Sequence, residues 1–461
     1  MVNEQYNVKR LFQMRKNVIL IPSNTDLNRG DEALVWESIS IIKDVYDDNV
    51  NILIVGSTDN SDTSKLQTRQ TKKLGYEILE TLLKHPGRYA SSDDVSYSKK
   101  TILKWGWVAI KDLIFSLLLL SKCSFLFNIA YKKMEEQQRY SYSKFKEADS
   151  VFVKGGGFLH SYGGLTDAYK IYYFLYLIIL SQRLGKKVYV LPNSIGPLKN
   201  SVARYLVKKI LRKCSLVTTR ESISQHFVKS IGISSFKFPD LGFYLKPSEF
   251  DFSSYLKDRG VDLNKTNVLF TLRPYRFDGA KDPKTLYSNY EQCVINTISY
   301  LDSKNIGITF FAHTLGPGLH EDDRVALLSV LKKLPENLRI KIIYISDDEL
   351  TCRDVEKIYS YYDYVIGTRF HSVIFSLNVN IPSIAIAYGG NKGKGIMEDL
   401  NNNMYSIDID KLNKESLIEK LDCLFISRKE YLNNLSVCRE YIKRQREILV
   451  SEIRKTITSN N

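Results

Sequence analysis

The chain has 461 residues, of which 44% are apolar and 25% are charged. This length exceeds one ordinary hydrophobic core and predicts at least two domains, while the apolar fraction excludes a disordered protein. The formal charge of +15 favours anionic partners. The basic residues form no nucleic-acid-binding motif, so we expect no nucleic acid partner. Six widely separated cysteines indicate neither a metal site nor a disulfide framework, and with no secretion signal they predict a cytoplasmic protein.

Strands and helices are predicted to alternate through the first half of the chain. Apolar runs predict strands at 18–21, 51–56, 150–154, 188–191 and 216–219. Helical patterns occupy 32–45, 66–84, 141–149, 169–184 and 202–214. Such alternation predicts a parallel sheet with helices on both faces. We assign residues 1–245 to this N-terminal Rossmann-like domain.

The alternation restarts after a segment rich in proline, glycine and polar residues at 239–257. Strands are predicted at 268–272, 306–312, 341–345, 364–366 and 383–387, and helices at 290–304, 322–334 and 351–360. A second Rossmann-like domain is therefore expected at 246–425, followed by a helical tail at 426–461. The predicted fold class is α/β, with two doubly wound domains facing a cleft in the glycosyltransferase-B arrangement.

A hydrophobic insert, at about 85–145, interrupts the first domain. Its stretch from Ile102 to Ala130 contains Trp105 and Trp107, but lysines divide it into apolar runs too short to span a bilayer. One interpretation is a helical hairpin buried against the protein. The alternative is an interfacial element that contacts a membrane or another subunit.

Three polar or glycine-rich segments follow predicted strands of the first domain. They contain Asn28, Gly30 and Asp31; Gly156 and Gly157; and Asn193. Ligands bind at the carboxyl ends of parallel strands, so these segments are candidates for substrate contact. Helix capping in the first segment and a simple glycine turn in the second remain open as structural explanations.

Arginines end three other apolar strands, at Arg220, Arg273 and Arg369. Arg369 follows Thr368 and precedes His371, which places a fixed cation beside a group that titrates near neutral pH. This combination suits an anionic substrate that must also be protonated. A glycine-rich loop after the last predicted core strand carries Lys392 and Lys394, and either lysine could be the functional one; we favour Lys392.

Taken in order, these motifs resemble the polysaccharide pyruvyltransferase family. The matching pieces are Asn28–Ala33, Gly155–Leu159, Asn193–Pro197, Arg220–Ser222, Gly367–Ser372 and the loop from Tyr388 to Lys392. The resemblance implies transfer of the enolpyruvyl carbons of phosphoenolpyruvate onto two hydroxyls of a sugar. The acceptor would belong to a surface polysaccharide or its lipid-linked precursor, and the products would be a pyruvate ketal and phosphate.

The resemblance also implies roles for the candidate residues. The catalytic residues would be His371, as general acid and base, and Arg369, which would hold the phosphate or the carboxylate. Phosphoenolpyruvate would be bound by Arg220, Arg369, Thr368, Lys392 and Arg273. The sugar acceptor would face Asn28, Gly30, Asp31, Gly156, Gly157 and Asn193. No metal or cofactor is expected beyond phosphoenolpyruvate as donor substrate.

Other expectations concern partners and alternatives. The insert and the positive charge favour a lipid-diphosphate-linked acceptor and peripheral contact with the inner face of the membrane. The sequence does not decide between a monomer and an oligomer. A nucleotide-sugar glycosyltransferase of the same fold is the rival enzyme. A non-catalytic subunit of polysaccharide assembly is the rival from another class.

Overall fold

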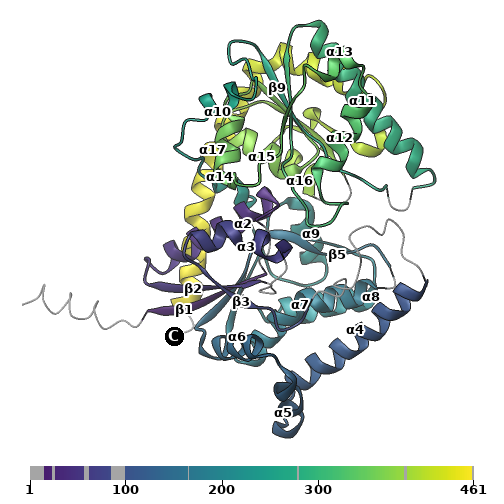
Figure 1. Cartoon of the computed structure of the whole chain (residues 1–461). Coiled ribbons are helices and arrows are strands. Elements are labelled where there is room, and N and C mark those ends of the chain that lie inside the picture. The colour runs from purple at the N-terminus through teal and green to yellow at the C-terminus, as the bar shows by residue number, and fades with distance from the viewer. Residues whose placement is uncertain are drawn as a thin grey trace, which may run out of the picture.

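The computed structural model describes residues 15–22, 26–56, 62–84, 99–164, 166–277, 280–388 and 392–458. It contains two α/β domains, one above the other in Figure 1, each built around a single parallel sheet. The two-domain α/β architecture predicted from the sequence is therefore confirmed.

The N-terminal sheet has the strand order β3-β2-β1-β4-β6-β7-β8, and β5 pairs with β6. Its strands are β1 (Lys16–Ile21), β2 (Val50–Gly56), β3 (Glu77–Glu80), β4 (Ser150–Val153), β5 (Gly156–Ser161), β6 (Lys187–Leu198), β7 (Leu216–Thr219) and β8 (Phe236–Lys237). Successive side chains of a strand point to opposite faces. Val18 and Leu20 accordingly pack in one core with helix α2 (Arg29–Val45), while Ile19 and Ile21 pack in a second core.

That second core is formed with helices on the opposite face of the N-terminal sheet. These helices include α6 (Glu136–Glu147), α7 (Asp167–Arg183) and α8 (Ser201–Leu211). Helix α3 (Asp62–Lys73) precedes β3, and α9 (Ser222–Ser230) follows β7. Because both faces of the sheet are covered, its central strands are apolar on both sides, as parallel sheets require.

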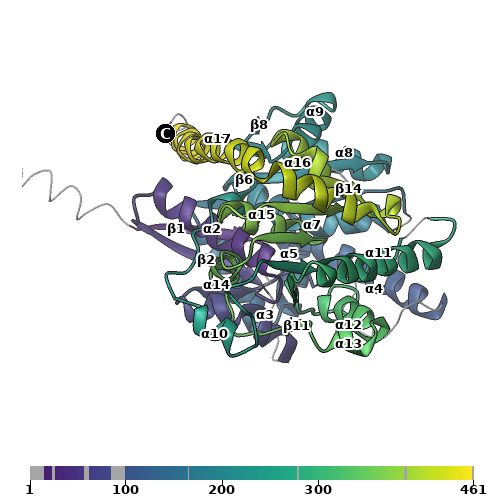
Figure 2. The same ribbon diagram turned by 90° about the horizontal axis from the view of Figure 1, so that it is seen from above.

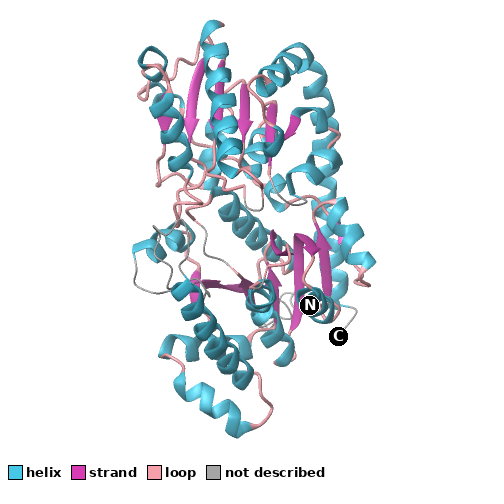
Figure 3. Cartoon of the chain, turned by 90° about the vertical axis from the view of Figure 1, so that its right-hand side faces the viewer, coloured by secondary structure: helices cyan, strands magenta, loops and turns pink. Residues whose placement is uncertain are grey.

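The C-terminal sheet has the strand order β11-β10-β9-β12-β13-β14, and Figure 3 shows its strands between layers of helices. Its strands are β9 (Asn267–Thr271), β10 (Gly307–Phe311), β11 (Ile343–Ile345), β12 (Tyr364–Gly367), β13 (Ser383–Ala387) and β14 (Ser406–Asp408). Its helices include α11 (Pro283–Ser303), α12 (Asp323–Lys333), α13 (Glu336–Arg339), α14 (Cys352–Tyr359), α15 (Phe370–Asn378) and α16 (Lys392–Asp399). The chain passes between the domains through the 3-10 helix η1 (Leu241–Tyr244) and α10 (Ser253–Lys257).

The last helix, α17 (Ser416–Thr458), runs from the C-terminal domain back along the N-terminal one, at one edge of the molecule (Figures 1 and 2). Its Arg446 Nη1 lies 2.6 Å from Asp44 Oδ2, and its Arg454 Nη2 lies 2.5 Å from Asp47 Oδ1. The boundary expected between residues 425 and 426 falls inside this helix. The predicted tail is thus continuous with the preceding helical turns.

One local prediction is wrong. The helix expected over 66–84 ends at Lys73, and Glu77–Glu80 instead joins the sheet as edge strand β3 beside β2. The glycine triplet, for which a simple turn had stayed open, leads directly into β5, whose Gly156 pairs with Asn193 of β6. In both cases pairing with a neighbouring strand overrides a weak local preference.

The hydrophobic insert forms a helical hairpin of α4 (Lys99–Leu119) and α5 (Ser124–Lys133) at the lower end of the N-terminal domain in Figure 1. Its predicted beginning, 85–98, lies outside the described residues. Among the helices that the structure describes, none is long and apolar enough to cross a membrane.

Candidate active site

The two domains meet at the N-terminal end of α2. The Arg29 backbone N–H donates to the His313 carbonyl at 3.3 Å, and the Leu315 N–H donates to the Leu27 carbonyl at 2.8 Å. The Glu32 carboxylate accepts a hydrogen bond from the backbone N–H of Cys352 at 3.0 Å. The first glycine-containing segment of the sequence therefore faces the C-terminal domain.

Asn28 is the N-cap of α2. Its Oδ1 accepts hydrogen bonds from the backbone N–H groups of Gly30 and Asp31, at 3.2 and 3.4 Å. Its Nδ2 donates to Asp31 Oδ2 at 2.9 Å, and Lys154 Nζ lies 2.9 Å from Asp31 Oδ1. The capping explanation left open by the sequence is thus correct for Asn28. Contact of Asn28, Gly30 or Asp31 with a substrate stays a prediction.

The His371 ring lies between two glycines of the N-terminal domain. A Cβ added at Gly30 would lie 2.1 Å from His371 Nδ1, and one added at Gly242 would lie 3.5 Å from His371 Cδ2. The helix start at Gly30 and the start of α15 at His371 are thus brought into direct contact, although they are far apart in the sequence. This close approach explains why position 30 requires a residue without a side chain.

Gly30→Ala tests this contact. Because the added methyl would overlap the ring and the Cβ of His371, α2 or α15 must shift. We expect a stability loss of about 1–3 kcal/mol. We also expect a fall in turnover of up to about 100-fold, because His371 is the predicted catalytic residue and a small displacement of such a group is costly. Thermal unfolding and steady-state rates measure the two effects.

Gly106→Ala is the matched control, since no atom lies within 4 Å of the position its Cβ would take. We expect wild-type stability and turnover for it. A Gly30→Ala variant that also behaves like the wild type would contradict the close packing of His371.

Asp240 is the carboxylate nearest to this histidine, and the sequence analysis did not select it. Its Oδ1 lies 3.7 Å from His371 Nε2 and accepts a hydrogen bond from the Gly242 N–H at 2.8 Å. Its Oδ2 accepts a hydrogen bond from Arg220. Burial alone would raise the pKa of Asp240, but the charge of Arg220 and the proximity of His371 hold that pKa well below its usual range. A buried carboxylate therefore faces His371 Nε2.

The Arg220 guanidinium is buried and paired. Its side chain is only 2% exposed, its Nη1 pairs with Asp240, and its Nε donates to Ser194 Oγ at 2.7 Å. Direct contact of Arg220 with phosphoenolpyruvate stays a prediction. Arg220 also reaches His371 through the carboxylate between them.

Arg369 is oriented by a second carboxylate that the sequence analysis did not select. Its Nε donates to Asp323 Oδ1 at 2.8 Å, and its Nη2 donates to the Glu321 carbonyl. Asp323 also accepts hydrogen bonds from the backbone N–H groups of His313 and Thr314. Burial raises the pKa of Asp323 to about 6, while Arg369 opposes that rise. The ion pair and the two backbone N–H donors favour the ionised carboxylate, which fixes the guanidinium two residues before His371.

Arg273 is the least constrained of the three predicted arginines. Its guanidinium carbon lies 4.1 Å from the ring centroid of Tyr388 and 5.8 Å from that of Tyr275. No carboxylate forms an ion pair with it in the described part of the chain. Arg273 follows β9 and Arg369 follows β12, and these strands pair at Thr271 and Gly367, so both arginines leave the same end of the sheet. Of the two, only Arg369 is in an ion pair with a described residue.

The structure describes the side chain of Thr368 but not those of the two loop lysines. The Thr368 side chain is buried, and its hydroxyl lies 3.0 Å from the Tyr290 hydroxyl, so it supports this region from inside. The backbone of Lys392 begins α16, but the side chains of Lys392 and Lys394 lie outside the described residues, as do residues 389–391. The choice between the two lysines stays a prediction.

The remaining predicted acceptor residues lie on β5 and β6 of the N-terminal sheet. Asn193 is fully buried, and its Nδ2 donates to the carbonyls of Lys154 and Leu191, at 2.9 and 2.8 Å. Gly156 pairs with Asn193, and the half-buried Gly157 follows it in β5. Asn193 therefore fixes the backbone at Lys154, whose side chain bonds Asp31.

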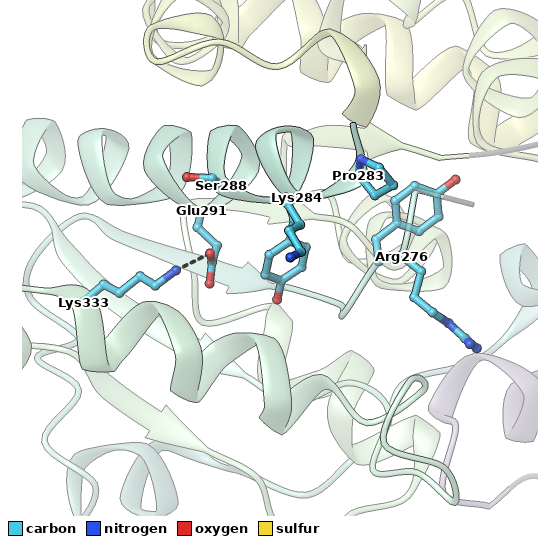
Figure 4. A pocket seen from close by; sticks show the side chains of 8 residues that line it. Arg276, Pro283, Lys284, Ser288, Glu291 and Lys333 are labelled. Carbon is cyan, nitrogen blue, oxygen red and sulfur yellow. Dashed lines mark hydrogen bonds and ion pairs between the residues drawn. The ribbon is translucent and has the colours of Figure 1, made fainter. Parts of the chain in front are cut away.

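A pocket of about 420 Å³ opens beside this site, at the start of α11 (Figure 4). Its charged lining comprises Arg276, Lys284, Glu291 and Lys333, and Glu291 pairs with Lys333. Figure 4 shows Arg276 pointing away from that pair. Among the described residues, none of the predicted site residues lines the pocket. Its connection to the site is Tyr275, which also lies near Arg273.

Comparison with solved structures supports the fold. The UDP complex of S. aureus MnaA aligns with a TM-score of 0.57 and 11% identity over 96% of this chain and 97% of that one. A glycosyltransferase from Rickettsia africae ESF-5 aligns with a TM-score of 0.55 and 14% identity over 98% of this chain and 100% of that one. Arabidopsis thaliana UGT89C1 bound to UDP aligns with a TM-score of 0.51 and 9% identity over 95% and 99%. The predicted glycosyltransferase-B architecture is confirmed, and at these identities the likeness concerns the fold alone.

Comparison of sequences identifies relatives. The chain is 23% identical over 288 residues to the amylovoran biosynthesis protein AmsJ of Erwinia amylovora; the match covers 60% of this chain and 66% of AmsJ. A family model described as polysaccharide pyruvyl transferase matches residues 28–390. That range includes all the predicted site residues except the loop lysines at its end. The chain belongs to the polysaccharide pyruvyl transferase family.

Proposed function

We propose that this protein transfers the pyruvyl group of phosphoenolpyruvate to two hydroxyls of a sugar in a surface polysaccharide or its precursor. The products are a cyclic pyruvate ketal and inorganic phosphate. The observation that carries the proposal is the placement of His371, enclosed by two glycines and facing the ionised Asp240. Arg369 stands two residues away, fixed by Asp323. Membership of the family supports the reaction class.

The donor carries a carboxylate and a phosphate, and both groups need cations. Arg273 and Arg369 are the first candidates, because the strands before them pair at Thr271 and Gly367, while the Arg220 side chain, 2% exposed against 10% for Arg369, is the more deeply buried. Arg369 Nη1 is the one terminal nitrogen of that guanidinium for which the described residues provide no hydrogen bond. Arg273 stacks on Tyr388 and pairs with no carboxylate of the described residues, so its charge is proposed to bind an anion. Lys392 is proposed to assist them.

His371 is proposed to move the proton. In its protonated form it gives a proton to the methylene carbon of phosphoenolpyruvate, which becomes a methyl group and leaves C2 electrophilic. A first sugar hydroxyl then bonds to C2 and returns a proton to His371. The C2–O bond to phosphate breaks, a second hydroxyl bonds to C2, and its proton leaves with phosphate. Asp240 stabilises the imidazolium during this cycle, because its fixed negative charge faces the ring that carries the proton.

The sugar is proposed to approach from the N-terminal domain, along the edge formed by Asp31, Lys154 and Gly157. The Asp31 carboxylate is partly exposed and Lys154 holds it in place, so it can accept a hydrogen bond from a sugar hydroxyl. Asn28 and Asn193 shape this edge through their hydrogen bonds to the backbone. They are proposed as positioning residues.

Incubation with phosphoenolpyruvate and a panel of sugar acceptors tests the proposal. We expect one phosphate released for each acceptor consumed, and a product heavier than the acceptor by one pyruvate less one water, detected by mass spectrometry. Release of a nucleoside diphosphate from a nucleotide sugar, without any need for phosphoenolpyruvate, would instead support the rival glycosyltransferase. Absence of phosphoenolpyruvate binding in calorimetry would support the non-catalytic alternative.

A further inference from the structure

The outer face of the α4–α5 hairpin carries a stripe of exposed apolar side chains. Trp107, Ile110, Ile114 and Leu117 are 61%, 50%, 54% and 53% exposed. Their spacing of three, four and three residues places them on one side of α4. The hairpin lies at the far end of the N-terminal domain from the C-terminal domain, where no other described helix covers this side (Figures 1 and 3).

The opposite face of α4 is fixed to the body of the protein. Ser116 Oγ lies 2.8 Å from the hydroxyl of Tyr172 in α7, and the hydroxyl of Tyr169 donates to Asp112 Oδ2 at 3.4 Å. Leu119 is only 2% exposed. Asp112, Ser116 and Leu119 share one side of the helix, as their spacing requires. The exposed stripe is therefore the outer surface of a docked helix.

The exposed charges of the hairpin are mostly positive. Lys111, Lys122, Lys132 and Lys133 are exposed, and Lys111 Nζ lies 5.4 Å from the centroid of the Trp107 ring. Between residues 106 and 134, which the structure describes throughout, Asp112 is the single carboxylate and it lies on the inner face. An apolar stripe on a lysine-rich hairpin, with a tryptophan and a lysine at one end, complements an anionic lipid surface.

We propose that the α4–α5 hairpin docks this protein on an anionic lipid surface, with α4 lying in the plane of the interface. From Trp107 to Leu117 the stripe is about 15 Å long at 1.5 Å per residue, which suits contact along the surface. A second copy of the chain would bring equal positive charges together across the same stripe, whereas lipid phosphates neutralise them. The proposal goes beyond the proposed function, since binding to lipid requires neither phosphoenolpyruvate nor a sugar.

Vesicle flotation of the full chain tests the proposal. The protein is mixed with phosphatidylcholine vesicles with or without phosphatidylglycerol, in the absence of both substrates. We expect flotation with the anionic vesicles, weakened by salt, and an at least tenfold lower partition coefficient for the double variant Ile114→Ser/Leu117→Ser. The matched control is Ile426→Ser/Val437→Ser on α17, where the side chains are 88% and 73% exposed. We expect the control to float like the wild type.

Three outcomes would overturn the proposal: no flotation of the wild type, equal flotation of the hairpin variant, or equal loss in the α17 control. A wild-type dimer that the hairpin variant converts to a monomer in sedimentation, without vesicle binding, would assign the stripe to self-association. Ketal formation on a water-soluble acceptor is expected to be unchanged in the hairpin variant. Failure of lipid binding and failure of the proposed reaction are thus measured separately.

Discussion

His371→Ala is expected to lower the rate of ketal formation by about 100- to 10,000-fold, the usual contribution of a positioned general acid. The reason is that Asp240, ionised and acceptor-only, cannot donate the proton in its place, and that burial lowers the pKa of the neighbouring His313 well below its usual range. Single-turnover measurement of phosphate release from phosphoenolpyruvate gives the rate of the chemical step. Calorimetry is expected to show little change in phosphoenolpyruvate affinity, because Arg273 and Arg369 are proposed to bind its anionic groups.

A comparison of His371→Ala with His371→Gln separates the loss of the acid from the loss of packing. His371→Ala leaves a space between Gly30 and Gly242, whereas His371→Gln keeps most of the volume but cannot act as an acid near neutral pH. Both are expected to lose turnover, and only the alanine variant is expected to lose measurable stability. His226→Ala is the matched control, because His226 is exposed on α9 and bonds only the backbone of its own helix in the described structure. A glutamine variant with near-normal turnover would remove His371 from the reaction.

Most of the fold could be predicted because buried parallel strands leave a strong pattern. The runs that became β1, β2 and β9 are almost entirely apolar, and each is followed within a few residues by a glycine or a polar residue at the sheet edge. The strand β3 has the weak pattern of a short edge strand with glutamates at both ends, and only pairing with β2 defines it. The β5 strand begins with glycines, which favour turns when considered alone.

The sequence predicts the cationic residues of the site but not its carboxylates. Arg220, Arg273 and Arg369 each end an apolar strand, so the sequence places all of them at the sheet edges. Asp240 lies after the very short β8, in a segment that reads as a linker, and Asp323 reads as an ordinary acidic residue in the first turn of α12. Contacts with these two aspartates, which lie in other segments of the chain, decide which arginines form an ion pair.

The folded chain separates two of the arginines. Arg220 is enclosed by Asp240 and Ser194, whereas Arg273 lies beside two tyrosines and pairs with no carboxylate among the described residues. Which of the two binds phosphoenolpyruvate stays a prediction. A residue of a motif can also act indirectly, by holding the group that lies beside the reacting side chain.

Asp240→Asn is expected to reduce both stability and turnover. The Arg220 guanidinium would remain buried without its carboxylate, and breaking one partner of a buried pair costs about 3–5 kcal/mol. Turnover is expected to fall because an amide does not stabilise the His371 imidazolium. The alkaline limb of the pH–rate profile should consequently move to lower pH. Denaturant titration and pH-dependent single-turnover rates measure the two effects.

The pH dependence of stability gives an independent readout. Because the pKa of Asp240 is lower in the folded chain than its usual value of about 4, its contribution to stability is present above that pH and is lost as the pH falls below it. Asp240→Asn should remove this part of the acid destabilisation. The variant would then resemble the wild type more closely at low pH than at neutral pH. An equal stability difference at both pH values would contradict an ionised Asp240.

The double variant Arg220→Met/Asp240→Asn separates the structural role of the pair from its role at His371. Removing both charges leaves neither member of the pair buried without its partner, and Glu221 keeps its hydrogen bonds from Ser194 and Ser224, so most of the stability lost in Asp240→Asn should return. Turnover should stay low, since His371 still lacks the carboxylate 3.7 Å from its Nε2. If turnover returned together with stability, Asp240 would act only by neutralising Arg220. If stability returned and turnover did not, the buried carboxylate would be a positioning and charge-stabilising group for His371.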